Sequence, residues 1–356
     1  MKNIIFILFV VSLLFSACSV DTKKYIIEDS DVVEIPKSVI ERMSNHELWI
    51  ARNEIYARKG RKFTNTFLES YFYNCEWYNP KIEPADFDEN LLSDVEKRNV
   101  ELLYSEQKKR DRQKKYPIKC EFNKEYSIDL DGDGVNERIS VTYKQGEWWT
   151  EDIQIHINEK HYDADCGILS LNERGYYITD IAHNKPGLEI ALMDYGPSSD
   201  LVTHFYVYSE GDVQYVGEVI DFPFEEYIKI DAFGQDNTVI AIKRTDVIET
   251  TFSYAYWIYD FEAKKISLRK DLMYNVAPIR EKTLKKPIYV YTEMDVNSPK
   301  KYLKPQKLYF LASDGNDWTK IKCEDNSICY IYSPHGQIEG TDEEKYEIYE
   351  PYIAYD

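Results

Sequence analysis

The sequence predicts an α+β multidomain protein with a small helical N-terminal domain, a β-repeat middle domain and a small β-barrel at the C-terminus. Three observations predict this order. Apolar residues recur at helical spacing before residue 112. Short runs rich in Ile, Val, Tyr and Phe, separated by Gly, Asn and Asp, follow Pro117. Several short strand-like runs crowd the segment after Pro287. A length of 356 residues is typical of two or three domains.

The first residues predict export. An apolar run of twelve residues, from Ile4 to Phe15, follows Lys2 and precedes Ser16-Ala17-Cys18. A helix needs about 20 apolar residues to span a bilayer, so the run predicts a signal peptide over residues 1–17. The Phe-Ser-Ala-Cys ending resembles the lipobox of bacterial lipoproteins, which implies lipidation of Cys18 (palmitate included) and membrane anchoring at the cell surface. An ordinary secretory signal with an unrelated Cys is the alternative.

The charge of the chain restricts its partners. The formal net charge is −19 at pH 7, which argues against nucleic acid and against binding to an anionic membrane surface through charge. A chain with this charge is suited to a solvated protein that encounters cations. The polar residues 18–35 have no clear period, so we expect a lipidated N-terminus and a spacer there, with the membrane as partner only through the lipid.

Residues 36–112 are predicted to form the helical domain. Ser44 and Glu47 have the spacing of a capping box, and Gly60 is typical of a residue that follows a helix end. The apolar residues between them recur at helical spacing: Leu48, Trp49, Ala51, Ile55 and Tyr56. Two further helices are expected over residues 66–73 and 93–109.

One string in this domain is specific. Tyr56-Ala57-Arg58-Lys59-Gly60, followed by Tyr71-Phe72 and Trp77-Tyr78, closely resembles the YARHG domain, a module of exported bacterial proteins. Lys59 stands where the family string has His. The resemblance implies an extracellular, cell-envelope role and no activity. Four residues are candidates either for a ligand surface or for maintaining the fold: Arg58, Arg61, Trp77 and Tyr78.

The middle domain is expected over residues 118–283 and contains a faint internal repeat. Asp129, Asp180 and Asp231 each begin a turn that precedes a strand-like run, and they are spaced by 51 residues each time. A period near 50 is typical of propeller blades or related β arrays. Three units are too few for an ordinary large propeller, so we expect a partial or small propeller-like domain.

The first of these turns carries a candidate metal site. Asp129, Asp131 and Asp133 occupy the first, third and fifth positions, Gly134 the sixth and Glu137 the ninth, as in the first part of a calcium loop. The loop resembles those of VCBS and FG-GAP propeller repeats. We predict at most one Ca²⁺ site, with its ligands from Asp129, Asp131, Asp133, Glu137 and the Val135 carbonyl. A metal-free Asp/Gly turn is the alternative.

The last segments are short. Residues 287–333 weakly resemble bacterial SH3-like domains, which often recognise cell-wall peptides. Residues 334–356 are expected to form an acidic tail that either packs as an edge or is loose. Strands are expected over 288–291, 307–311, 318–322 and 329–332. Cys323 and Cys329 flank a predicted turn, so we expect them to face each other and to form a disulfide.

Catalytic patterns are mostly missing from the sequence. The chain contains no GxSxG, HExxH or P-loop string. We therefore expect that the protein is not an enzyme. We expect a cell-surface lipoprotein with a binding or scaffolding role in the bacterial cell envelope, whose partner is a cell-wall or surface ligand. The alternative is an exported cell-wall-polymer hydrolase that uses carboxylates of the β domain, such as Glu225 and Glu226.

Overall fold

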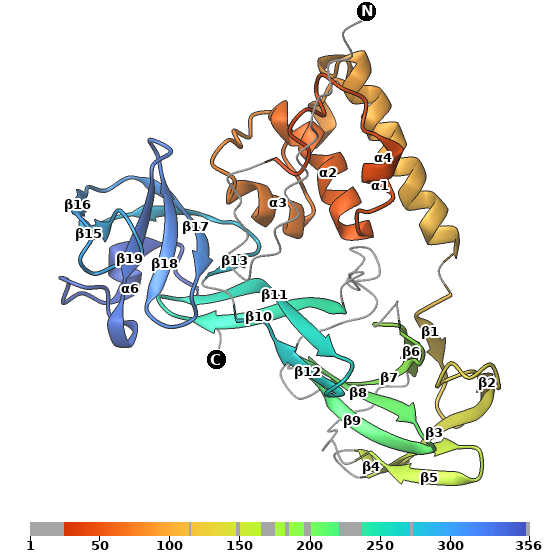
Figure 1. Cartoon of the computed structure of the whole chain (residues 1–356). Coiled ribbons are helices and arrows are strands. Elements are labelled where there is room, and N and C mark those ends of the chain that lie inside the picture. The colour runs from red at the N-terminus through yellow and green to blue at the C-terminus, as the bar shows by residue number, and fades with distance from the viewer. Residues whose placement is uncertain are drawn as a thin grey trace, which may run out of the picture.

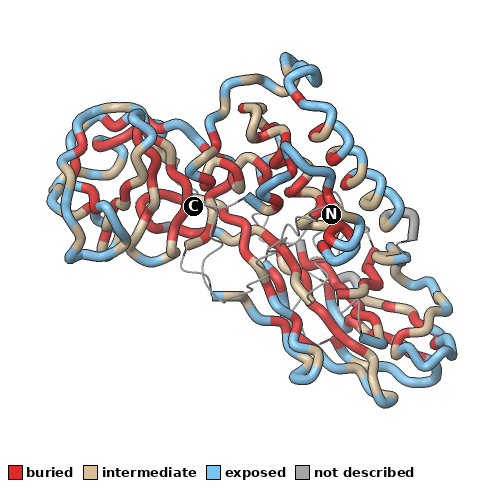
Figure 2. Tube along the Cα trace, turned by 45° about the horizontal axis from the view of Figure 1, so that its top comes forward, coloured by how far each residue is buried: buried red, intermediate tan, exposed pale blue. Residues whose placement is uncertain are grey.

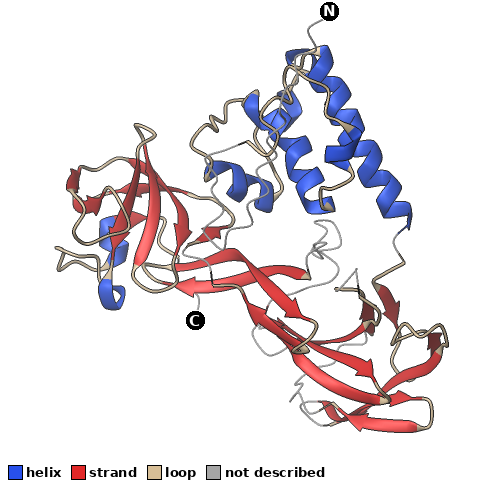
Figure 3. Ribbon diagram, in the orientation of Figure 1, coloured by secondary structure: helices blue, strands red, loops and turns tan. Residues whose placement is uncertain are grey.

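The computed structural model describes residues 25–113, 115–146, 150–164, 175–181, 185–195, 201–220, 237–270 and 273–353. Cys18, Asp231 and the Glu225–Glu226 pair lie outside these residues. A helical part lies against a larger β part, which extends to both sides beneath it (Figure 1). The same division appears when the chain is coloured by secondary structure (Figure 3). Over the described residues, the structure contains no helix with the length and apolar character that a bilayer requires.

The helical part confirms the helices expected from the sequence. It contains α1 (Lys37–Ile40), α2 (Asn45–Arg58), α3 (Thr66–Tyr73), the 3₁₀ turns η1 (Pro84–Asp86) and η2 (Glu89–Leu91), and α4 (Asp94–Gln113). The predicted capping box is present: the Glu47 N–H donates to Ser44 Oγ at 3.0 Å, and the Ser44 N–H donates to Glu47 Oε2 at 2.7 Å.

The segment before α1 belongs to this helical part. Asn99 of α4 is fully buried and donates through Nδ2 to the carbonyls of Ser30 and Val33, both at 2.8 Å. Its Oδ1 accepts the N–H of Ile35 at 2.8 Å. These bonds satisfy main-chain groups that would otherwise be buried without partners. Residues 25–35 are therefore packed chain and not the spacer that their composition indicated.

The described residues of the β part form three antiparallel sheets. The four-stranded sheet has the order β2 (Tyr126–Ile128), β3 (Glu137–Gln145), β4 (Thr150–Ile157), β5 (Lys160–Asp163). The five-stranded sheet has the order β1 (Ile118–Cys120), β6 (Tyr176–Thr179), β7 (Glu189–Tyr195), β8 (Leu201–Ser209), β9 (Asp212–Ile220). A shared apolar core joins these two sheets. The other face of the five-stranded sheet contributes to a core that includes helical residues such as Phe67 and Phe72.

The third sheet has eleven strands and crosses the predicted domain boundary near residue 285. Its main path is β10 (Thr238–Asp246), β11 (Thr250–Asp260), β13 (Tyr274–Val276), β17 (Lys307–Ser313), β18 (Trp318–Cys323), β19 (Ile328–Tyr332), β15 (Ile288–Tyr291), β16 (Lys300–Leu303). Off this path lie β12 (Lys265–Leu268), β14 (Glu281–Leu284) and β20 (Tyr349–Glu350). The strands expected after Pro287 are thus observed.

The described residues form neither a closed barrel nor a propeller. The reason is visible in the pairing, because β13 pairs with β11 on one side and with β17 on the other. This pairing extends one open sheet through both regions. The sequence therefore correctly predicts helices followed by a β-rich remainder, whereas the propeller-like middle and the closed SH3-like barrel are not observed.

The segment after residue 333 packs as part of the fold. It contains η4 (Pro334–Gly336) and α6 (Lys345–Ile348), and it places Ile338, Ile348 and Tyr349 in the apolar core beneath β14–β19. Figure 2 shows buried chain running along the sheets and along the inner sides of the helices. Of the two alternatives for the acidic tail, residues 334–353 therefore show the packed one, because their apolar residues complete this core.

A buried ion pair fastens the end of the chain. Lys282 Nζ lies 2.6 Å from Glu249 Oε1, and both side chains are at most 3% exposed. Lys282 also donates to the carbonyl of Pro351 at 2.6 Å, while the Ile353 N–H donates to Glu249 Oε2 at 3.2 Å. Burial raises the pKa of Glu249 and lowers that of Lys282, so each charge depends on the other.

We expect Lys282→Ala to lower the free energy of unfolding by about 3–5 kcal/mol, because it leaves the Glu249 carboxylate buried without its cation. The double variant Lys282→Met, Glu249→Leu removes both charges, so its free energy of unfolding should fall by less than that of Lys282→Ala. Urea unfolding followed by circular dichroism measures both. A single variant that unfolds like the parent protein would contradict this assignment.

Candidate metal site

The acidic loop connects two paired strands, β2 and β3. Ile128 at the end of β2 pairs with Glu137 at the start of β3, so the loop begins and ends at one point of the sheet. The Asp129 carboxylate accepts the N–H groups of Gly132 at 2.8 Å and Gly134 at 3.0 Å. Both glycines have positive φ, 77° and 90°, which a residue with a Cβ rarely adopts. Asp129 therefore organises a tight turn around its own side chain.

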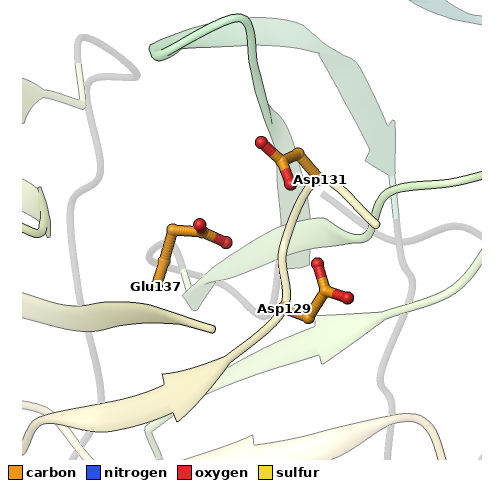
Figure 4. A group of neighbouring side chains, drawn as sticks. All are labelled: Asp129, Asp131 and Glu137. Atoms are coloured by element: carbon orange, nitrogen blue, oxygen red, sulfur yellow. The ribbon is translucent and has the colours of Figure 1, made fainter. Parts of the chain in front are cut away.

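Three carboxylates converge on this turn. Asp129, Asp131 and Glu137 each offer one oxygen, and these oxygens lie within 4.8 Å of one another. Figure 4 shows the three side chains surrounding a common space. Glu137 is 5% exposed, whereas Asp129 and Asp131 are half-buried. Burial, followed by the negative charges of Asp131 and Asp133, raises the pKa of Glu137. A cation in this space would relieve that repulsion.

Two of the predicted ligands lie outside this group. Asp133 is exposed, and its Oδ1 accepts the N–H of Val135 at 2.7 Å. Val135 is 65% exposed and contributes this N–H to the loop. The structure thus brings together three of the five predicted ligands, and roles for the Asp133 carboxylate and the Val135 carbonyl remain predictions.

The second unit of the sequence repeat has the same local structure. Leu130 follows Asp129 and donates its N–H to Glu137 Oε2 at 2.8 Å. Ile181 follows Asp180 and donates its N–H to Glu189 Oε2, also at 2.8 Å. Glu189 begins β7 and pairs with Thr179 at the end of β6, as Glu137 pairs with Ile128. Two of the three units are therefore a true structural repeat, and the third, at Asp231, lies outside the described residues.

The two repeat loops are in direct contact. The Leu188 N–H donates to the carbonyl of Leu130 at 2.8 Å. A Cβ on Gly132 would lie 2.7 Å from Pro186 Cβ, closer than carbon atoms can approach. Gly132 is therefore required both for its backbone conformation and for this contact. The acidic loop lies where the four-stranded and five-stranded sheets meet.

The YARHG-like residues lie mostly inside the helical part. Arg58 is 10% exposed, pairs with Glu54 at 2.8 Å, donates to the carbonyl of Ile27 at 2.6 Å and stacks over the Tyr25 ring at 3.6 Å. Tyr78 is 1% exposed and donates to the Arg61 carbonyl at 2.9 Å. These placements support the fold-maintenance alternative for Arg58 and Tyr78.

Arg61 and Trp77 are half-buried and contact aromatic rings. The Arg61 guanidinium lies 5.4 Å from the centre of the Tyr56 ring, and Trp77 packs against Tyr25 with 4.9 Å between ring centres. A ligand role for these two residues remains a prediction.

Lys59, which replaces the His of the family string, has a structural role that sequence reasoning missed. Its Nζ lies 2.8 Å from Glu96 Oε1, and the Glu96 side chain is 1% exposed. The pair connects the end of α2 to the first turn of α4. Ser93 and Glu96 have capping-box spacing, and the Ser93 N–H donates to Glu96 Oε2 at 2.8 Å. The capping-box spacing of Ser93 and Glu96 is the sequence signal that could have identified Glu96 as a structural residue.

Comparison with known proteins supports the assignment of the helical part. A family model described as the YARHG domain matches residues 23–108, which include the packed segment before α1. This domain indicates an extracellular or periplasmic protein and is not a known catalytic domain. Comparison with curated proteins and with solved structures found no match.

Glu189 makes stability depend on pH. Burial raises its pKa from 4.5 to about 8, because desolvation outweighs the hydrogen bond from Ile181. The folded state therefore holds this proton more tightly than the unfolded chain. The contribution of Glu189 to the free energy of unfolding is fully present below about pH 4.5 and is lost as the pH rises through about 8.

We expect Glu189→Gln to raise the melting temperature relative to the parent protein more at pH 9 than at pH 5, because Gln stays neutral while Glu189 must ionise. Thermal unfolding between pH 5 and pH 9 measures this. The exposed Glu159→Gln is the matched control. A constant difference between Glu189→Gln and the parent across this range would overturn the prediction.

Proposed function

We propose that this chain is a cell-surface lipoprotein with a binding or scaffolding role in the bacterial cell envelope, and that its β part binds one Ca²⁺ ion in the 129–137 loop. The match to the YARHG domain supports an exported location. The signal-peptide pattern and the Ser16-Ala17-Cys18 ending support lipidation.

One observation carries the calcium proposal: the buried Glu137 lies among acidic neighbours, and no side-chain cation pairs with it among the described residues. Glu54, Glu96 and Glu249, which are buried equally well, each have an Arg or Lys within 2.8 Å. Ca²⁺ prefers carboxylate and carbonyl oxygens in a flexible loop. The ion would supply the positive charge that the protein supplies to the other three glutamates.

We expect millimolar Ca²⁺ to raise the melting temperature. A Ca²⁺ concentration of about 100 times the dissociation constant would stabilise the folded state by about 2.7 kcal/mol. Glu137→Gln and Asp131→Asn should abolish the response, because each removes one of the converging carboxylates. Glu189→Gln, in the repeat loop that lacks the two middle acids, is the matched control and should keep the calcium response. Calcium titration of all four proteins, with Mg²⁺ for comparison, distinguishes a metal site from a metal-free turn.

The lipid proposal has its own test. Mass spectrometry of the mature protein from bacterial membranes should find a lipid-modified Cys18 at the N-terminus. Cys18→Ala should release the protein from the membrane fraction while leaving its calcium response unchanged. If the mature N-terminus is unmodified, the protein is secreted without a lipid anchor, and the proposed membrane-anchored role is wrong.

Binding to the cell envelope is tested with purified peptidoglycan. Retention of the protein on the polymer without release of fragments is the expected result. Release of soluble fragments would favour the alternative hydrolase. Absence of both would leave cell-wall polymer excluded as the ligand and would direct the search to surface proteins.

A further inference from the structure

The hairpin of β4 and β5 places two histidines opposite each other. His156 of β4 pairs with His161 of β5, and the centres of their rings lie 6.4 Å apart with 45° between the ring planes. Directly opposed residues on neighbouring antiparallel strands project from the same face of the sheet. That face is the outer one, because Ile155 and Ile157, which alternate with His156 along β4, belong to the apolar core. His156 is half-buried and His161 is exposed, so solvent reaches the pair.

The turn between the two strands fixes this pairing. Ile157 pairs with Lys160, which leaves Asn158 and Glu159 as a two-residue connection. Asn158 has a φ of 54°, a conformation that Asn adopts more readily than most residues. Its N–H donates to the Arg138 carbonyl at 2.9 Å, and its Oδ1 accepts the Arg138 N–H at 3.0 Å. The hairpin is therefore held against β3, which opposes any shift in register that would separate the two histidines.

One ring nitrogen of His156 is already oriented by the neighbouring strand. Its Nε2 lies 2.8 Å from Thr142 Oγ1 of β3. In the tautomer in which Nε2–H donates to this hydroxyl, Nδ1 keeps a free lone pair. Within the part of the chain that the structure describes, neither His156 Nδ1 nor the His161 ring has a hydrogen-bond partner. A hydrogen bond from the second nitrogen is typical of histidines that bind metal ions.

The charged groups around the pair do not oppose a cation. Arg138 and Lys144 of β3 are each ion-paired with an acidic side chain. Lys160 projects from the other face of the sheet and donates to the Gly211 carbonyl at 2.8 Å. Asp163, which follows on the outer face of β5, adds a negative charge. A cation between the two rings would therefore meet no unpaired positive side chain among the described residues of β3, β4 and β5.

A metal ion between the rings requires only a small movement of the side chains. Imidazole nitrogens bind Zn²⁺ at about 2.0–2.1 Å, so two rings that share one ion have centres roughly 5 Å apart. The observed separation of 6.4 Å must therefore close by roughly 1.5 Å. Rotation of the exposed His161 side chain can supply this movement without any change in the strands.

We propose that His156 and His161 bind one first-row transition-metal dication, Cu²⁺ or Zn²⁺, on the outer face of the β4–β5 hairpin. Imidazole is a good ligand for these ions, whereas Ca²⁺ binds oxygen, so the site is chemically separate from the 129–137 loop. The two nitrogens leave the remaining coordination positions to water. This site goes beyond the proposed calcium and envelope roles and is tested independently of them.

Isothermal titration of the untagged full chain with Cu²⁺ and with Zn²⁺ tests the proposal. We expect one site that binds Cu²⁺ more tightly than Zn²⁺. His156→Asn and His161→Asn should each weaken binding by roughly 100-fold, because the chelate becomes a single ligand. The matched variant His335→Asn, which removes an exposed histidine outside the pair, should bind like the parent. Electron paramagnetic resonance of the Cu²⁺ complex should show two nitrogen ligands in the parent and one in either single variant.

Two further proteins decide where the metal binds. The double variant His156→Asn, His161→Asn should lose the site, and equal Cu²⁺ affinity of this variant and the parent would overturn the proposal. Glu137→Gln, which disables the acidic loop, should leave Cu²⁺ binding unchanged. Loss of Cu²⁺ binding in Glu137→Gln together with its retention in the double variant would place the ion in the acidic loop and contradict the histidine site.

Discussion

Burial of carboxylates against main-chain N–H groups is the constraint on which the rest of this structure depends. The described residues bury five glutamates, and each accepts a backbone N–H: Glu54, Glu96, Glu137, Glu189 and Glu249. These bonds hold the N-terminal segment against α2, close the start of α4 and the two repeat turns, and hold residue 353 against the turn that precedes β11. A buried acceptor of this kind is costly to leave unsatisfied, so it fixes the local path of the chain.

These glutamates differ in how their charge is neutralised. Glu54, Glu96 and Glu249 face Arg58, Lys59 and Lys282 at hydrogen-bonding distance. Glu189 holds a proton near neutral pH. Glu137 has acidic neighbours within its turn, and burial raises its pKa, so either a proton or the proposed metal ion would neutralise it. The same backbone motif, used twice in the repeat, thus gives a proton-dependent turn in one copy and a candidate metal turn in the other.

The sequence predicts those features that depend on near neighbours. Ser44 and Glu47 mark a helix start because both partners of the capping box lie within one turn, and the acidic loop is recognisable because its ligands follow a fixed spacing. Features made by distant residues are not predictable in this way. Asn99 holds a segment more than 60 residues earlier in the chain, and β13 joins two predicted domains into one sheet. Composition marked residues 25–35 as a spacer because their buried partners lie elsewhere in the sequence.

The packed N-terminal segment also determines how far the protein can stand from a membrane. Arg58 and Glu54 bind the chain at residues 25–28 through hydrogen bonds and a cation–π contact. This segment begins only seven residues after Cys18. A fully extended chain of that length reaches about 25 Å. With the proposed lipid on Cys18, Tyr25 would lie within this distance of the membrane surface. A force on the lipid anchor would then be transmitted first to the Arg58–Glu54 pair.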